Sequence, residues 1–394
     1  MVSKLPIALV ILLAASPSPA QTTRQTQADD YTRYELLAPG SGKFRILYEV
    51  TATTPGATHF FNAIRRGSVA TDERVTDLMT GLPLQFEVVN GAVARAGGVR
   101  GADSTGEYIR VTLARSVPTN GETRLLIDKT YFDTGSYRMA GDTILFDRSL
   151  GIKRNAVVLP AGFELVSSNY PAQVLQETDG RLKVSFWNNT PAAAPLRIRA
   201  RRAAAGATSQ PLPAELRRRL AERAHQTREI VYELQQPETH AFDLYHDYTE
   251  TRPGVGRYSN VVRAGSKVSR PRAVLLDTGE ELRWDLQVLR DSLGAESEVV
   301  VFHFTPPKAN ESVRLRMYET YTDSVRYTLV GDELVWNRAF GRASNVVVLP
   351  SGWILTNSSI PATVDETSDG RIRLTFINAR PDEIAVLITA RRRR

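Results

Sequence analysis

Apolar and polar residues alternate with a period of two over much of the chain, which predicts β-strands with one buried face. One face of the segment 43–50 is apolar and carries Phe44, Ile46, Tyr48 and Val50. The alternation recurs in residues 84–88, 108–113 and 182–186. We therefore expect on the order of a dozen short strands in each half of the chain and no helix among them.

Turn-forming pairs with glycine separate several of these strand-like segments. Asp179-Gly180 and Asp369-Gly370 each lie between two such segments, and Gly141-Asp142 and Gly331-Asp332 resemble a second set of paired turns. Asp-Gly is a strong hairpin signal because glycine adopts positive φ without steric cost. Closely spaced strands without helical periodicity between them predict an antiparallel β-sandwich rather than βαβ units.

The chain contains this pattern of strands and turns twice. Residues 34–81 correspond to residues 232–279, which lie 198 positions later, and residues 141–202 correspond to residues 331–392, which lie 190 positions later. In the second alignment 25 of 62 positions are identical. A repeat of this length indicates an internal duplication. The expected fold is therefore all-β, with two tandem antiparallel β-sandwich modules joined by a short helical linker.

The pattern divides the chain into five segments. They are a signal peptide (1–20), a disordered leader (21–30), a first β-sandwich module (31–202), a linker with a short helix (203–226) and a second β-sandwich module (227–394). The two offsets differ by eight residues, and the difference falls in the glycine-rich residues 89–106, which we expect to form a loop. Residues 213–224 have a helix-forming composition, and we expect Leu216 and Leu220 to dock on one of the modules.

The first 20 residues resemble a secretory signal peptide. Lys4 precedes an apolar run over residues 5–15, and small residues precede Gln21, so cleavage is expected between Ala20 and Gln21. The run is too short to span a bilayer, and no membrane span is expected after cleavage. The chain contains no cysteine, which excludes disulfides and thiolate metal sites. We expect a periplasmic or secreted protein.

The formal net charge of +7 is concentrated in short arginine clusters at residues 197–202, 217–219 and 391–394. For an exported protein, a basic surface favours an anionic polymer, a glycan or an envelope protein as the partner, and no nucleic acid is expected. A solvated edge that keeps the protein soluble is the simpler explanation of these clusters.

We assign no catalytic residue, metal ligand or cofactor. The sequence has no His-Glu-x-x-His, Gly-x-Ser-x-Gly or phosphate-binding loop, and none of its five histidines has a counterpart in the other copy. Paired carboxylates for glycoside chemistry meet only in the folded chain. The acids kept in both copies are Asp133 and Asp323, Asp142 and Asp332, and Asp179 and Asp369.

Polar and aromatic residues kept at fixed positions in both copies are the candidate binding residues. They are Tyr131, Asp133, Arg148 and Asn155, their counterparts Tyr321, Asp323, Arg338 and Asn345, and Trp353, which stands where the first copy has Phe163. In each copy we expect the Asp and the Arg to form a partly buried ion pair that fixes strand register, with the Asn satisfying nearby backbone groups. Ligand contact is the alternative. The aromatic at 163 and 353 is expected in the core, with a glycan-stacking platform as the alternative.

Two classes of function remain open from the sequence. The favoured one is an exported, non-catalytic β-sandwich protein that binds a polymer or protein partner at the cell envelope. The alternative is a carbohydrate-active or other hydrolytic enzyme whose carboxylates come from distant strands. The order of strands is similar to that of β-rich accessory domains that precede secreted peptidases, although this resemblance identifies no family.

Overall fold

The computed structural model describes residues 23–204, 213–226, 229–290 and 296–393. Almost all of its regular elements are strands, so the expectation of an all-β fold is confirmed. The predicted signal peptide and much of the predicted linker lie outside the described residues. The leader is shorter than predicted, because the first strand already begins at Gln27. Within the described ranges, no helix has the length and apolar character needed to cross a membrane.

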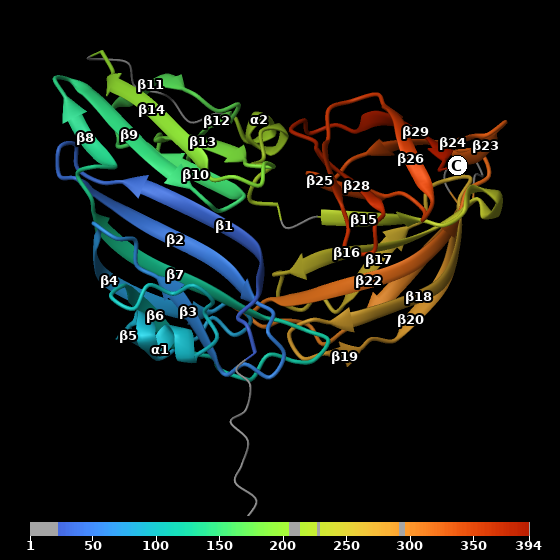
Figure 1. The fold of residues 1–394 in the computed structure, drawn as a ribbon, viewed down its shortest axis with the longest axis horizontal. Coiled ribbons are helices and arrows are strands. Elements are labelled where there is room, and N and C mark those ends of the chain that lie inside the picture. The colour runs from blue at the N-terminus through green and yellow to red at the C-terminus, as the bar shows by residue number, and fades with distance from the viewer. Residues whose placement is uncertain (1–22, 205–212, 227–228, 291–295, 394) are drawn as a thin grey trace, which may run out of the picture.

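Three sheets build the first half of the chain (Figure 1). The seven-stranded sheet has the spatial order β12 (Gln173–Gln176), β13 (Leu182–Trp187), β10 (Arg154–Val158), β1 (Gln27–Leu36), β2 (Lys43–Ala52), β7 (Thr123–Phe132) and β4 (Val69–Asp77). A four-stranded sheet consists of β11 (Phe163–Ser168), β14 (Ala194–Arg202), β9 (Thr143–Leu150) and β8 (Tyr137–Ala140). A three-stranded sheet consists of β3 (His59–Ala63), β6 (Glu107–Thr112) and β5 (Phe86–Asn90), followed by the helix α1 (Gly91–Ala96).

Three further sheets build the second half. The eight-stranded sheet has the order β19 (Glu280–Glu281), β18 (Lys267–Leu275), β22 (Val313–Thr322), β16 (Ala241–Glu250), β15 (Glu229–Leu234), β25 (Ser344–Val348), β28 (Ile372–Ile377) and β27 (Thr363–Glu366). The smaller sheets are β23 (Tyr327–Val330), β24 (Glu333–Phe340), β29 (Ile384–Arg392) and β26 (Trp353–Ser358), and β17 (Arg257–Val261), β21 (Glu296–His303) and β20 (Trp284–Arg290). The parallel pairing of β1 with β10 recurs between β15 and β25. The remaining helices are α2 (Ala214–Arg219) and the short 3₁₀-helix η1 (Pro237–Thr239).

In each half the core lies between the large sheet and the two smaller ones. The alternation predicted for residues 44–50 is confirmed, because all four apolar side chains of that face are buried. They pack with Phe146 and Leu196 of the four-stranded sheet and with Ile109 and Val111 of the three-stranded sheet. Full burial of one such side chain contributes roughly 1.5–3 kcal/mol. In Figure 1 the two smaller sheets of the first half cover different parts of the large sheet, with β8, β9 and β14 above and β3, β5 and β6 below.

The predicted hairpin turns are confirmed. Gly141-Asp142 joins β8 to β9, and Gly141 has a φ of 62°. Asp179-Gly180 lies in the connection between the antiparallel strands β12 and β13, where Gly180 has a φ of 84°. Positive φ at these positions suits glycine because it has no Cβ. The turns therefore set the register of the strand pairs that they connect.

Two expectations about helices were wrong. The glycine-rich segment 89–106 contains α1, where the Asn90 side chain accepts a hydrogen bond from the Val93 N–H, and Ala94 of α1 packs in a small cluster with Phe61 and Tyr108. The linker helix is only six residues long, and Leu216 and Leu220 are 43% and 47% exposed instead of docked on a module. For α1, contacts made by the folded chain rather than helical periodicity decide the outcome.

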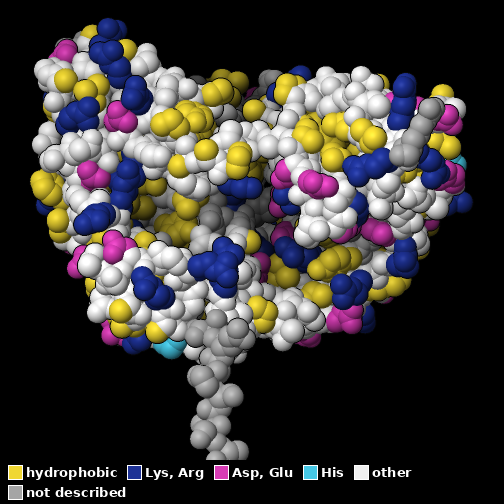
Figure 2. Space-filling model, viewed as in Figure 1, with side chains coloured by type: hydrophobic (Ala, Val, Ile, Leu, Met, Phe, Trp, Pro, Cys, Tyr) yellow, Lys and Arg dark blue, Asp and Glu magenta, His cyan; other side chains and the backbone are white. Residues whose placement is uncertain are grey.

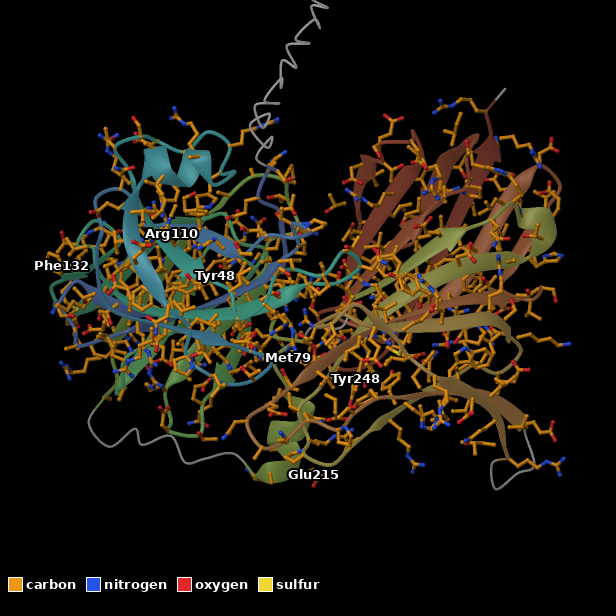
Figure 3. All side chains as sticks on the ribbon, turned by 90° about the horizontal axis from the view of Figure 1, so that it is seen from below. Tyr48, Met79, Arg110, Phe132, Glu215 and Tyr248 are labelled. Carbon is orange, nitrogen blue, oxygen red and sulfur yellow. The ribbon has the colours of Figure 1, made fainter. Side chains whose placement is uncertain are left out.

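Buried polar contacts join the two halves of the molecule. The Arg124 guanidinium on β7 donates to both carboxylate oxygens of Asp277, at 2.8 and 2.9 Å, and to the Ser312 hydroxyl at 3.0 Å. Arg124 is 3% exposed and Asp277 is fully buried. The Ser312 N–H donates to the Met79 carbonyl at 2.9 Å, and Figure 3 shows Met79 where the two lobes meet. The halves are therefore connected by a buried ion pair as well as by the linker.

Candidate functional site

The predicted pair Asp133 and Arg148 meets just beyond the end of β7. Arg148 Nη1 on β9 lies 2.9 Å from Asp133 Oδ2, and the two side chains are 5% and 12% exposed. Asp133 also accepts hydrogen bonds from the Ser136 N–H at 2.9 Å, the Ser136 hydroxyl at 2.7 Å and the Ser68 hydroxyl at 3.1 Å. Burial alone would raise the pKa of Asp133, but these hydrogen bonds and the Arg148 charge hold it below its usual value. The predicted charge-assisted, partly buried bond is confirmed.

Asp323 and Arg338 occupy the corresponding place in the second half, but their contact is looser. Arg338 Nη1 lies 3.6 Å from Asp323 Oδ2, whereas Arg326 Nη1 donates to the same oxygen at 3.0 Å. The Ser266 hydroxyl donates to it at 2.8 Å. Arg326 stands where the first half has Ser136, and this substitution provides the second cation. The two predicted residues are thus within salt-bridge distance in both halves, but the predicted hydrogen bond between them forms only in the first, because Arg338 Nη1 has no hydrogen-bond partner among the described residues.

Aromatic rings enclose the arginine of each pair. The guanidinium carbon of Arg148 lies 5.2–5.9 Å from three ring centroids, and that of Arg338 lies 5.0–5.8 Å from three. The rings are those of Tyr34, Phe44 and Tyr131 in the first half and of Tyr232, Phe242 and Tyr321 in the second. Cation–π attraction strengthens when the site is desolvated, so these rings stabilise a charge that burial alone would disfavour. The cage explains why these residues are kept in both halves without requiring a ligand.

The remaining predicted residues have structural contacts. The Asn155 and Asn345 amides each donate to the backbone carbonyl three residues earlier, at 2.7 and 2.9 Å, as predicted. Trp353 is 3% exposed, its Nε1 donates to Gln236 at 2.9 Å, and the Arg392 guanidinium lies over its ring. The aromatic at this position therefore belongs to the core, as expected, and offers no open face for stacking a sugar.

A cavity of about 360 Å³ opens beside the Arg148 cage, with walls from the large sheet, β3, β6 and β9. Figure 2 shows this face of the left-hand lobe hollowed, with hydrophobic and cationic side chains around the hollow. The polar side chains of its lining include those of Tyr34, Tyr48, Asn62, Lys129, Tyr131 and Arg148. We call this feature the lysine cavity. Its volume is typical of sites for small molecules or for one unit of a polymer.

Lys129 is an inward-facing residue of β7 and is 3% exposed. Its Nζ donates to Asn62 Oδ1 at 2.5 Å and lies 5.0 Å from the centroid of the Tyr131 ring. Burial, and after it the Arg148 charge, lowers the pKa of Lys129 to about 7, while the Glu73 charge acts in the opposite direction. Lys129 therefore gains or loses its proton near neutral pH, whereas a solvated lysine does so near pH 10.4.

Glu319 occupies the position of Lys129 in the second half. It is 2% exposed, and its Oε2 accepts a hydrogen bond from the Asn260 amide at 2.7 Å. Asn260 corresponds to Asn62, so the same pair of positions interacts in both halves. Burial raises the pKa of Glu319 to about 7. One inward position thus holds a basic residue in the first half and an acidic residue in the second. Burial shifts the pKa of each toward a value at which more of its neutral form is present.

The lining of the lysine cavity is cationic. It includes Lys129, Arg148 and Arg65, and no Asp or Glu belongs to it among the described residues. Asp133 is bonded to Arg148, and its charge also acts on Arg65. An anionic group in the cavity would meet an ammonium group and tyrosine hydroxyls, and hydrogen bonds between charged groups are about twice as strong as neutral ones. The arrangement is therefore suited to binding a carboxylate, sulfate or phosphate.

Sequence reasoning missed Lys129 because the candidates were chosen among residues whose chemical type is kept in both copies, and Lys129 has Glu319 as its counterpart. A signal was nevertheless present in β7, where Leu125, Ile127, Lys129 and Tyr131 alternate on one face. A lysine on an otherwise apolar face either extends to water or is buried with a polar or charged partner. The alternation of inward and outward residues in β7 therefore indicates a buried lysine, although the comparison of the two copies does not.

The other duplicated acids of the first half lie in separate turns. Asp142 accepts a hydrogen bond from the Thr143 hydroxyl at 3.1 Å, and Asp179 accepts two from Arg181. These local contacts account for both acids as turn residues. Throughout the described ranges, no three or more His, Cys, Asp or Glu side chains are grouped so that they could hold a metal ion.

Comparisons with known proteins assign no family. No protein-family model and no curated protein matches the chain. Among solved structures, the chain is similar to a mutant M1 zinc metallopeptidase from Deinococcus radiodurans, with 10% identity, a TM-score of 0.29, and coverage of 44% of this chain and 41% of that one. It is also similar to a candidate protease from Parabacteroides distasonis, with 10% identity, a TM-score of 0.25 and coverage of 93% of each chain.

A collagen adhesin from S. aureus is similar as well, with 7% identity, a TM-score of 0.18, and coverage of 80% of this chain and 86% of that one. The part of the chain that matches the metallopeptidase covers about two fifths of the metallopeptidase's own length, 41%. All three TM-scores lie below 0.5, so no functional inference is drawn from these similarities.

Proposed function

We propose that the chain is an exported, non-catalytic binding protein of two tandem β-sandwich modules, and that its first module binds an acidic unit of an anionic polymer at the cell envelope. The modules are residues 31–202 and 227–394, derived from one duplicated unit and joined by residues 203–226. The order of sheets, the recurring parallel pairing and the paired arginine cages support the duplication. Export through a signal peptide at residues 1–20 belongs to the same proposal.

The observation that carries this function is the charge of the lysine cavity. Three cationic side chains line it, and none of its described lining residues is acidic. Burial lowers the pKa of Lys129 to about 7, so the ammonium form is less favoured near neutral pH than that of a solvated lysine. A bound anion lowers the free-energy cost of burying the ammonium, because it pairs with that charge in place of the water that burial removed. Anion binding and protonation of Lys129 are therefore coupled.

Oligomers of galacturonic acid and their methyl esters provide a matched test, because the two differ in charge and little else. Titration calorimetry on the mature protein should show that the acid binds at least about tenfold more tightly than the ester, which corresponds to 1.4 kcal/mol. Affinity for the acid should rise as the pH falls from about 8 to about 6, because the protonated fraction of Lys129 rises through its pKa of about 7.

Lys129→Met should abolish the preference for the acid, whereas Lys43→Met, at an exposed lysine of β2, should leave it unchanged. Equal binding of acid and ester, or an unchanged preference in the Lys129→Met protein, would contradict the proposal. Cleavage of the oligomer during the titration would instead support the hydrolytic alternative.

A further inference from the structure

Lys129 differs from the other little-exposed lysine of the same large sheet in what its nitrogen contacts. Lys183 Nζ, on β13, lies 2.6 Å from carboxylate oxygens of both Glu177 and Glu222, which balance its charge. Lys129 Nζ instead donates to the neutral Asn62 amide oxygen at 2.5 Å. A buried lysine with a neutral partner loses its proton more readily than one paired with carboxylates.

The Lys129 nitrogen is therefore available as an uncharged amine. Burial, and after it the Arg148 charge, lowers its pKa to about 7, and the Glu73 charge opposes this shift without an ion pair in the described part of the chain. Near neutral pH the amine form is thus far more populated than in a solvated lysine, whose pKa is about 10.4. An uncharged amine has a lone pair, and lysines desolvated beside another cation form imines with carbonyl compounds.

A proton donor belongs to the ring beside this amine. The Tyr131 ring centroid lies 5.0 Å from Lys129 Nζ. The Tyr131 hydroxyl oxygen accepts a hydrogen bond from the Arg65 N–H at 3.1 Å, which leaves its O–H as a donor for a ligand. Burial raises the pKa of Tyr131, so the hydroxyl keeps its proton near neutral pH. Tyr131 can therefore donate a hydrogen bond to a carbonyl oxygen in the cavity.

The same cavity contains groups that suit a carboxylate. The guanidinium carbon of Arg148 lies 5.5 Å from the centroid of the Tyr131 ring, over which Lys129 Nζ also lies. Arg65 is exposed and lines the cavity as well. A compound with a carbonyl group and a carboxylate a few bonds apart can therefore reach the amine and a guanidinium together, and pairing with the guanidinium orients it for attack.

We propose that the lysine cavity captures small oxo acids, which are aldehydes or ketones that carry a carboxylate, as imines of Lys129. The amine lone pair forms a bond to the carbonyl carbon, and the carbonyl oxygen takes a proton to give a carbinolamine. A C=N bond then forms as the C–O bond breaks. In net terms both amine hydrogens leave with the carbonyl oxygen as one water molecule, so no oxidant or reductant is needed. Tyr131 assists by its hydrogen bond to the departing oxygen.

This reaction goes beyond reversible binding of an anion, and it concerns the first half of the chain alone. In the second half Glu319 stands at the position of Lys129, so a carboxyl group replaces the amine there. The polymer of the proposed function takes no part in the reaction. Capture of an oxo acid and binding of the polymer can therefore be tested separately, and either can fail without the other.

Reductive trapping on the full-length protein tests the inference. The matched probes are 4-oxobutanoate and butanal, because both are aldehydes of the same chain length and only the first carries a carboxylate. Cyanoborohydride at neutral pH converts an imine into a stable secondary amine, which peptide mass spectrometry locates and quantifies. With 4-oxobutanoate, Lys129 should be modified at least about tenfold more than the exposed Lys43 or the paired Lys183, because its amine form is more populated.

Butanal should modify Lys129 at least about fivefold less than 4-oxobutanoate does, because it has no charge for a guanidinium to bind. Arg65→Met should reduce this preference, whereas Arg66→Met should leave it unchanged, because the neighbouring Arg66 side chain is 91% exposed and is not among the described lining residues. Equal modification of Lys129 and Lys43, or no modification of Lys129, would overturn the inference. Equal reaction of Lys129 with the two aldehydes would overturn the assignment to oxo acids.

Discussion

At the scale of single residues, the two halves of the chain share a structural pair and differ at one buried, charged position. Asp133 and Arg148 have counterparts in Asp323 and Arg338, and each arginine lies in a cage of three rings. Lys129, by contrast, is replaced by Glu319 at the same inward position. Contacts within the fold account for the pair that recurs, whereas Lys129 is the one cationic lining residue of the cavity that the second half replaces with an acid.

Asp133→Asn should destabilise the protein by about 2–3 kcal/mol, near the lower end of the range for a broken buried ion pair, because Asp133 is partly exposed. The substitution leaves the Arg148 guanidinium buried without a counter-charge. Urea unfolding measures the effect, and Asp142→Asn, in an exposed turn, should change the free energy of unfolding by less than about 0.5 kcal/mol. An Asp133→Asn protein that is as stable as the parent but has lost ligand binding would assign the aspartate to the site instead.

At the scale of elements, strands and hairpins could be predicted from the sequence, whereas the helix α1 could not. Alternation at residues 44–50 and the turn at Gly141 are local signals, and both are confirmed. The six residues of α1 are too few to form a stable helix alone. They are helical because Asn90 caps the first turn and Ala94 packs against Phe61 and Tyr108, which come from other strands.

The candidate site could be predicted only in part, because it also depends on contacts between segments that are distant in the sequence. Arg148 and Tyr131 were found because both copies keep them, and the structure places both in the wall of the lysine cavity. The alternation of β7 places Lys129 on the inward face, but its partner Asn62 comes from a different sheet and could not be predicted. A cavity between sheets depends on how the sheets pack, and packing has no local signature in the sequence.

Substitution of turn glycines tests the assignment of the hairpins. Gly141→Ala should cost about 1 kcal/mol, because its φ of 62° is unfavourable for a residue with a Cβ even though no atom lies within 4 Å. Gly151→Ala is the matched control, because that glycine also has open space around it but no positive φ. Thermal unfolding of the two variants should therefore differ. Equal stability would mean that the turn at Gly141 has a different conformation.

At the scale of the whole molecule, the buried contacts between the modules predict that they stay together after the linker is cut. Trypsin should cleave at Arg217–Arg219, next to the exposed Leu216 and Glu215 (Figure 3), and not beside Ala224, which is 1% exposed. The two fragments should nevertheless co-elute in size-exclusion chromatography, because Arg124 and Asp277 remain paired in the interface. Separate elution of two fragments would show that the linker alone holds the modules together.

The most direct test of an anion site in the first module is the pKa of Lys129, measured by NMR from the Cε chemical shift of labelled lysine over a pH titration. In the free protein, Lys129 should titrate near its pKa of about 7, and saturating galacturonic acid oligomer should raise that pKa, because the bound anion favours the ammonium form. The methyl ester should leave the pKa unchanged. A Lys129 that titrates near 10.4 in the free protein, or one whose pKa the acid does not move, would contradict the anion-binding role of the cavity.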